Sequence, residues 1–163
     1  MHSGPVIVGF DGSPASGRAL REAAALLAPR PALVVVAWEA GRAFEAATLP
    51  VKALEMPPAA LDIRTAFEAE TAAYDAAQQL AEQGAALARQ AGLEADGLAV
   101  ADDVTVAETL ARLAGELGGQ VVVIGAHRHR HLGKLVPGST LSELLRQAPC
   151  PVLVGGVAHD DQD

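Results

Sequence analysis

The stretch Val121-Val122-Val123-Ile124-Gly125 and the loop that follows it, through Gly138 and Ser139, decide the fold. A short continuous run of β-branched residues that ends at a glycine is typical of a strand buried on both faces of a sheet. Such strands belong to parallel sheets, whose connections are usually helices. We therefore expect an α/β domain in which 121–124 is a central strand and a helix opens at Ser139 or Ser142.

The same pattern repeats on both sides of this stretch. Short apolar runs predict further strands at 5–10, 33–38, 98–101 and 152–154. Amphipathic segments lie between them, and Ser13 and Thr105 stand where helix caps are expected, with Glu108 completing a capping box. Strands that alternate with helices predict an open five-stranded parallel sheet with helices on both faces.

The segment after the second strand breaks the pattern. Residues 39–62 contain Pro50, Pro57 and Pro58 and show no clear periodicity, so we expect a long surface loop. A long helix is expected from about 64 to 91, with Gly92 as its stop. Its buried stripe is predicted to consist of Ala73, Ala77, Leu80, Gly84, Leu87 and Ala91.

Composition bounds the class of protein. The chain has 163 residues, of which 50% are hydrophobic and 20% charged, so we expect one globular domain over 1–157 and a short tail over 158–163. The net charge of −8 argues against nucleic acid or an anionic membrane as the main partner. No leader and no apolar run of about 20 residues stand out, so we expect a cytoplasmic protein.

The single cysteine, Cys150, excludes a disulfide within the chain and favours a reducing compartment. It is interpreted as a small buried residue, with a redox sensor as the alternative.

Two loops are candidates for a ligand site. In open parallel sheets, ligands bind beyond the carboxyl ends of the strands, at a point where strand order reverses. The loops 9–13 and 125–140 each combine glycine, small polar residues and a helix start, a composition that suits an anion cradle of backbone amides. If the two preceding strands are neighbours, the loops face one crevice, and a phosphorylated ligand is the natural occupant. The P-loop and the dinucleotide G-x-G-x-x-G patterns are absent from both loops.

The spacing in the second loop resembles that of the ATP-binding branch of the universal stress protein family, which carries G-x2-G-x9-G-[ST] after its fourth strand. Gly125, Gly138 and Ser139 match this motif. Further likeness lies in segments that run over nearly the whole chain, up to about Val157: 6–13, 36–39, 138–141 and 148–154. The resemblance implies an adenine nucleotide alpha hydrolase-like, Rossmann-like fold.

The resemblance also implies a site and a function. The family's ligand is ATP, or AMP or ADP, with or without Mg, and its role is that of a stress-response sensor or regulator. Asp11 and Ala37 would lie near the adenosine, while Gly9 and Ile124 would line the pocket. The phosphates would be held by Gly125, Ala126, Gly138, Ser139 and Thr140. A homodimer would form through the last strand, at Val152, Leu153 and Val154.

One position departs from the motif, because Arg128 stands where the second glycine is expected. Glycine permits a close approach of backbone to phosphate that arginine does not. Either the site is degenerate and no longer binds ATP, or the Arg128 side chain contacts the anion, with Arg130 as a second contact. His127, His129 and His131 alternate with these arginines, which would repel a metal ion, so a solvated basic loop is favoured over a metal site.

Other polar residues have two interpretations. Asp11 is either a ligand residue or part of an Asp-Gly turn, and Asp102 and Asp103 either face the crevice or serve a loop or cap. Trp38 either covers a base or packs at the strand end. No nucleophile–base pair and no paired-carboxylate metal site stand out, so we expect nucleotide binding with at most slow hydrolysis. The alternatives are a dimeric interaction module without nucleotide and a slow ATP-hydrolysing or adenylyl-transferring enzyme.

Overall fold

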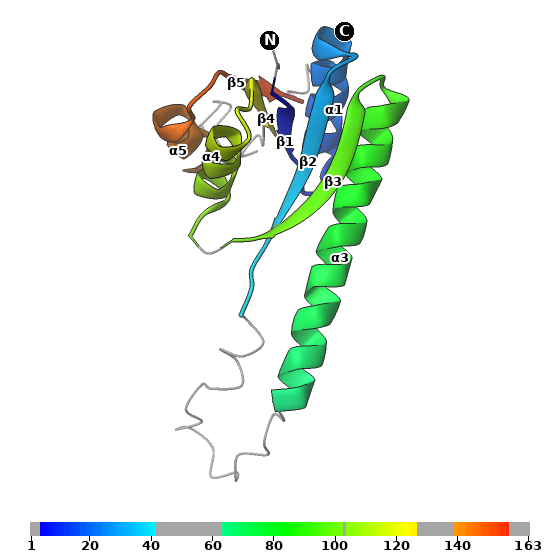
Figure 1. Cartoon of the computed structure of the whole chain (residues 1–163), viewed down its shortest axis with the longest axis vertical. Coiled ribbons are helices and arrows are strands. Elements are labelled where there is room, and N and C mark those ends of the chain that lie inside the picture. The colour runs from blue at the N-terminus through cyan, green and yellow to red at the C-terminus, as the bar shows by residue number, and fades with distance from the viewer. Residues whose placement is uncertain (1–3, 42–62, 103, 127–138, 157–163) are drawn as a thin grey trace, which may run out of the picture.

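The computed structural model describes residues 4–41, 63–102, 104–126 and 139–156 (Figure 1). Its strands are β1 (Val6–Gly9), β2 (Pro31–Trp38), β3 (Glu94–Ala101), β4 (Val121–Gly125) and β5 (Val152–Gly155). Its helices are α1 (Pro14–Leu27), α3 (Ile63–Gln90), α4 (Val106–Glu116) and α5 (Ser139–Gln147). The strands form one five-stranded sheet in the order β3-β2-β1-β4-β5, and every neighbouring pair is parallel. The expected open parallel sheet is confirmed, and β1 and β4 are neighbours.

Helices cover both faces of the sheet. Helices α1 and α3 pack on one face, and α4 and α5 pack on the other (Figure 1). Because side chains alternate along a strand, each strand contributes to two cores. The α1/α3 core takes Val8, Val36 and Val123, whereas the α4/α5 core takes Ile7, Val35 and Ile124. Both cores are built almost entirely from aliphatic side chains.

The helix ends follow the capping residues in the sequence. Ser13 caps α1, since its hydroxyl accepts a hydrogen bond from the N–H of Ser16 at 3.2 Å. Thr105 caps α4 by accepting from the N–H of Glu108 at 3.2 Å. Gly92 follows α3 and Gly118 follows α4, both with positive φ, as expected for helix stops. No helix in the described ranges is both long enough and apolar enough to span a bilayer.

Strands β2 and β3 begin earlier than expected, and the buried stripe of α3 begins later. Strand β2 begins at Pro31 rather than at Leu33. Strand β3 begins at Glu94 rather than at Leu98, because it is an edge strand whose exposed Glu94 and Asp96 interrupt the apolar pattern. Ala73 was expected in the buried stripe of α3 and is exposed. Ala66 is buried near the start of α3, but the side chains of this helix that join the core over the sheet begin at Ala77.

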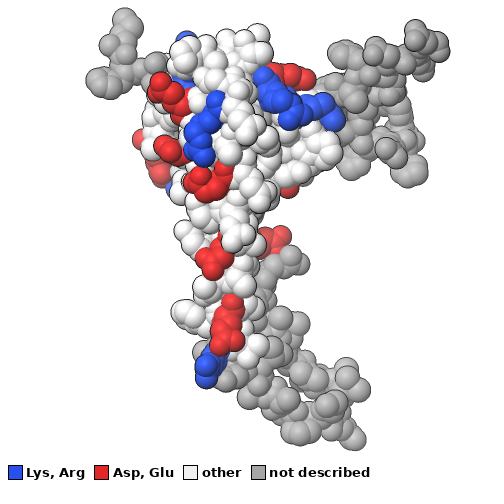
Figure 2. Space-filling model, turned by 90° about the vertical axis from the view of Figure 1, so that its right-hand side faces the viewer, with Lys and Arg blue, Asp and Glu red and all other residues white. Residues whose placement is uncertain are grey.

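Ala73 is exposed because the first part of α3 extends beyond the sheet (Figure 1). A helix of 28 residues is about 42 Å long, whereas the 8-residue strands β2 and β3 span only about 27 Å. This part of α3 is lined with acidic side chains on the face seen in Figure 2, and it includes the exposed Glu68 and Asp75.

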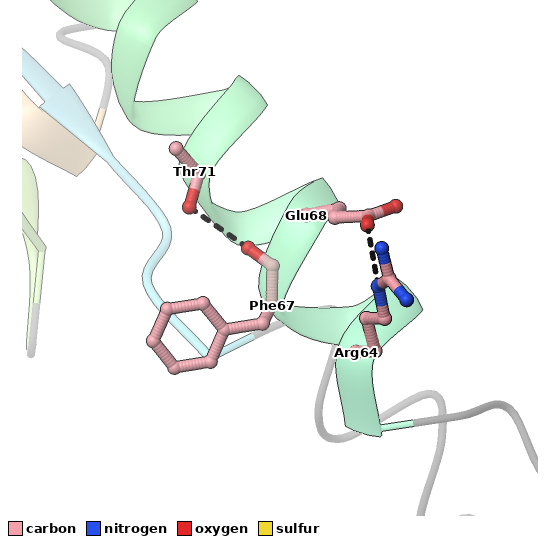
Figure 3. Close-up of polar contacts among 4 residues, drawn as sticks. All are labelled: Arg64, Phe67, Glu68 and Thr71. Carbon is pink, nitrogen blue, oxygen red and sulfur yellow. Dashed lines mark hydrogen bonds and ion pairs between the residues drawn. The ribbon is translucent and has the colours of Figure 1, made fainter.

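Two contacts in the extended part of α3 join residues one helical turn apart. Arg64 pairs with Glu68 at 3.2 Å, and the Thr71 hydroxyl donates to the carbonyl of Phe67 at 2.9 Å (Figure 3). Exposed pairs of this kind contribute only a few tenths of a kcal/mol. Longer-range contacts tie the helix to the end of β2. The rings of Trp38 and Tyr74 meet edge-on with centroids 5.8 Å apart.

A carboxylate adds to this link between α3 and the end of β2, because Glu70 accepts a hydrogen bond from the N–H of Gly41. Trp38 also packs against the α1/α3 core. The packing interpretation of Trp38 is therefore the one that the structure supports.

Candidate functional site

The carboxyl ends of β1 and β4 lie side by side. Val8 pairs with Val123 in the parallel register, so Gly9 at the end of β1 lies close to Ile124 and Gly125 at the end of β4. The N–H of Phe10 donates to the carbonyl of Val35 at 2.9 Å, which places the chain after β1 next to β2. The two loops that the sequence singles out therefore start from adjacent strands.

Three predicted site residues share one face of the sheet. Val8 and Val36 belong to the α1/α3 core, so their successors Gly9 and Ala37 point to the α4/α5 face. Ile124 lies in the α4/α5 core itself. The structure thus brings together on one face the residues expected to surround the adenosine.

Gly9 lies directly over Leu110 of α4. A Cβ at position 9 would lie 2.9 Å from Leu110 Cδ1 and 3.5 Å from Ile124 Cγ2. The absence of a side chain at position 9 therefore lets Leu110 of α4 pack against the backbone at the end of β1.

Gly125 lies on the opposite face and contacts the start of α1. A Cβ there would lie 2.7 Å from the Ser16 N and 2.8 Å from the Ala15 carbonyl carbon, both of which are backbone atoms. The first turn of α1 therefore rests directly on the end of β4. Ala126 follows, and its N–H donates to the carbonyl of Gly155 at 2.8 Å, so this predicted phosphate-binding amide is engaged within the sheet.

Asp11 sits at the start of α1. Its Oδ1 accepts a hydrogen bond from the N–H of Ser13 at 2.9 Å, and the residue is exposed. The turn interpretation of Asp11 is therefore present in the structure. The same bond holds Ser13 in place as the cap of α1, so the carboxylate stands at a helix N-terminus with one face toward solvent.

The second loop ends at the start of α5, which begins at Ser139 as one of the two predicted starts requires. The first amides of a helix have no partner within it and favour an anion. Thr140 in this first turn is half-buried. The rest of the predicted motif lies outside the described residues: Arg128, Gly138, His127, His129, Arg130 and His131.

Asp102 has an environment that the sequence did not reveal. Its N–H donates to the carbonyl of Trp38 at 2.8 Å, which continues the β2–β3 ladder by one residue. Its Oδ1 is buried, and among the described residues it is the only buried side-chain nitrogen or oxygen without a hydrogen-bond partner. Its neighbour Asp103 lies outside the described residues.

The surroundings of Cys150 favour its interpretation as a packing residue over that as a redox sensor. The side chain packs against the α4/α5 core just before β5. Burial raises the pKa of the Cys150 thiol, and a hydrogen bond with the Val122 backbone offsets part of that rise. A raised thiol pKa lowers the fraction of reactive thiolate. No group of three or more His, Cys, Asp and Glu side chains suited to a metal occurs in the described ranges.

Two charged residues of α1 hold the chain where β5 ends, and sequence reasoning missed both. The Arg18 guanidinium donates to the carbonyl of Gly156 at 3.1 and 3.2 Å, and Glu22 accepts from the N–H of Gly156 at 2.9 Å. Both backbone groups of Gly156 are thereby bonded. The sequence does place Arg18 and Glu22 four residues apart on one helix. That spacing is equally typical of an ion pair exposed to solvent, so it does not predict their contact with Gly156.

Comparison with known proteins agrees with this architecture. The chain matches the universal stress protein family over residues 3–155. It resembles the universal stress protein from Archaeoglobus fulgidus, with a TM-score of 0.67, 20% identity, and coverage of 95% of this chain and 99% of that one. No curated protein matches it in sequence.

Two further solved structures contain nucleotides. The Archaeoglobus fulgidus protein in complex with dAMP matches with a TM-score of 0.59 and 19% identity over 95% of this chain and 99% of that one. A universal stress protein in complex with cAMP matches with a TM-score of 0.57 and 21% identity over 96% of this chain and 97% of that one. The fold is thus the Rossmann-like one that the sequence predicted. With the family matched over residues 3–155, the chain belongs to the universal stress protein family.

Proposed function

We propose that this protein binds an adenine nucleotide beyond the carboxyl ends of β1, β2 and β4 and acts as a stress-response sensor or regulator. The observation that carries the proposal is the adjacency of β1 and β4, whose following loops each lead into a helix N-terminus. Relatives of the same fold are solved with dAMP and cAMP. Both ligands contain adenine and a single phosphate, which fits a site with one apolar end and one anion-binding end.

The adenosine lies on the α4/α5 face in this proposal. Gly9, Ala37 and Ile124 share that face and offer backbone and aliphatic surface to a base and ribose. Asp11 stands beside them, next to the capped start of α1. Gly9, Ala37 and Ile124 make up the apolar end of the proposed site, and Asp11 adds a charge beside it.

The phosphates lie toward the start of α5. The amides of Ser139 and Thr140 have no acceptor within the helix and supply an anion site at its N-terminus. Gly125 and Gly138 flank the loop. Gly125 also allows the backbone of α1 to pack closely against the end of β4. Ala126 starts the loop beside the phosphates but does not donate its amide to them, since that amide bonds to the carbonyl of Gly155. Mg bound by the phosphates themselves is compatible with this arrangement.

Calorimetric titration tests this proposal. We expect AMP, ATP and cAMP to bind, and we expect Asp11→Ala to weaken binding more than Asp11→Asn, because asparagine keeps the acceptor for the Ser13 amide. No heat and no thermal shift with any of the three at millimolar concentration would rule out nucleotide binding and favour the interaction module. Phosphate release from ATP, measured on the same preparations, tests the further proposal that the protein binds rather than hydrolyses.

Arg128→Gly is the most informative change within this titration. If the arginine side chain contacts phosphate, the variant loses about ten-fold in ATP affinity, the usual contribution of a charge-assisted hydrogen bond. Adenosine, which has no phosphate, should then bind both proteins equally. A gain in ATP affinity would show instead that Arg128 obstructs the loop.

We also propose a homodimer through β5. The carbonyls of Pro151 and Gly155 accept from the N–H groups of Val122 in β4 and of Ala126 directly after it. Because hydrogen-bonding direction alternates along a strand, the backbone groups of Val152 and Val154 point to the free edge of the sheet. An edge strand of this kind is a template for pairing with a second strand. The groups of Gly156, the next to face outward, are already bonded to α1.

Val154→Pro tests the dimer. Proline removes an N–H that points to the free edge and leaves the bonds to β4 intact, so the domain should fold and the dimer should dissociate. Sedimentation velocity on the wild type and the variant measures the oligomeric state, and circular dichroism checks the fold. A monomeric wild type, or a variant that dimerises as strongly as the wild type, contradicts this interface.

A further inference from the structure

The buried Oδ1 of Asp102 is a polar atom that the fold itself does not satisfy. A buried acceptor that has lost its water and gained no donor destabilises the fold. Asp102 belongs neither to a cap nor to an ion pair among the described residues, and its N–H is bonded to Trp38 in the sheet ladder. A donor that arrives with a ligand would remove this cost.

The position of Asp102 places this oxygen on the face of the proposed adenosine site. Ala99 of β3 lies in the α1/α3 core and Val100 packs against the α4/α5 core. The same alternation carried on to position 102 directs Asp102 to the α4/α5 face, with Gly9, Ala37 and Ile124. Ala37 pairs with Val100, so Asp102 lies just beyond Ala37 on the neighbouring strand.

The strand order places Asp102 at the base end of a bound nucleotide. The proposed phosphate site follows β4, and the sheet runs β3-β2-β1-β4. Three steps between strands separate β3 from β4, which amounts to about 14 Å at the usual strand spacing. In a nucleotide the ribose lies between phosphate and base, so the base is the part that reaches the end of β3.

A carboxylate can only accept hydrogen bonds, so its partner on the ligand must be a donor. The exocyclic 6-amino group is the donor that adenine offers. We propose that Asp102 is a specificity-determining residue whose Oδ1 accepts a hydrogen bond from the 6-amino group of the bound adenine. This inference rests on the proposed function, since it assigns the recognition of the base within the same site.

The test compares ligands that differ only in that amino group. AMP and purine riboside 5′-monophosphate are titrated against the wild type and Asp102→Ala. The wild type should bind AMP about ten-fold more tightly than the analogue, as expected for a hydrogen bond to a charged acceptor. The alanine variant should lose this preference and keep its affinity for the analogue.

Two variants control for structure. Asp96→Ala removes a carboxylate from the same strand at the other end of the sheet, where the residue is exposed, and should discriminate like the wild type. Asp102→Asn keeps the shape and one acceptor oxygen without the charge, so it should show an intermediate preference. It also serves as the test if the alanine variant does not fold. Circular dichroism and thermal melting establish that each variant is folded.

The outcomes separate this inference from the proposed function. If no nucleotide binds the wild type, both fall together. If AMP binds but folded Asp102→Ala or Asp102→Asn discriminates as strongly as the wild type, only the role of Asp102 is overturned. If GMP binds the wild type more tightly than AMP and Asp102→Ala reverses that order, the carboxylate reads the N1–H and 2-amino donors of guanine. That result overturns both this role of Asp102 and the adenine preference of the proposed function.

Discussion

Gly125→Ala should lower the free energy of unfolding by about 2–3 kcal/mol, a large cost for the addition of one methyl group. The new Cβ would lie 2.7 Å from the Ser16 N and 2.8 Å from the Ala15 carbonyl carbon. Backbone atoms cannot rotate away as the end of a side chain can, so either α1 or β4 must shift. The end of β4 is also part of the proposed phosphate site, so the shift should weaken AMP binding as well.

Urea unfolding followed by circular dichroism measures the effect of Gly125→Ala. Gly17→Ala is the matched control because it adds the same methyl group within α1, where the nearest atom to the new Cβ is the Arg21 guanidinium Nη1 at 3.9 Å. Alanine in place of glycine inside a helix should stabilise by about 0.5–1 kcal/mol. A Gly125→Ala protein as stable as the wild type would show that α1 does not rest on the end of β4.

The second large effect is expected from Leu110→Ala, at about 2–5 kcal/mol of lost stability. Leu110 is 1% exposed and is among the largest fully buried side chains in the described ranges. It belongs to the same buried hydrophobic cluster as Ile7, Val122 and Leu144. Removing it leaves a cavity between α4 and the sheet, directly under Gly9 at the end of β1.

Thermal melting and urea titration measure the loss of stability in Leu110→Ala. The affinity for AMP is a second measurement. Since Leu110 supports Gly9 from below, the variant should bind AMP more weakly than its loss of stability alone explains. Leu145→Ala is the control, because Leu145 lies on α5 and is 63% exposed, so its truncation should cost less than about 0.5 kcal/mol. Equal costs for the two variants would contradict the assignment of Leu110 to the core.

Much of the sheet could be predicted from the sequence because its central strands are buried on both faces. Residues 121–124 and 33–38 are continuous apolar runs, and the structure has β4 and β2 over them. Strand β3 was predicted too short, since an edge strand tolerates Glu94 and Asp96 on its exposed side. The stripe of α3 was predicted too long at its start because helical periodicity does not reveal where the sheet ends.

The candidate site could be predicted in outline and not in detail. Glycine spacing and helix starts identified the loops after β1 and β4, and the adjacency of those strands is confirmed. The bonds of Arg18 and Glu22 to Gly156 join residues 138 and 134 positions apart, a pairing that no local pattern encodes. The environment of Asp102 was equally hidden, because burial of a single carboxylate oxygen depends on the packing around it rather than on its neighbours in sequence.

The contacts at the start of α3 indicate which parts of the molecule are expected to move together. Tyr74 and Glu70 link the extended part of this helix to Trp38 and Gly41 at the end of β2, rather than to the centre of the sheet. Such a segment opens as its own cooperative unit, with a lower opening free energy than the core. Ala37 lies next to that segment. We therefore expect the adenosine end of the proposed site to move with the extended part of α3, and the β4 end to move with α1.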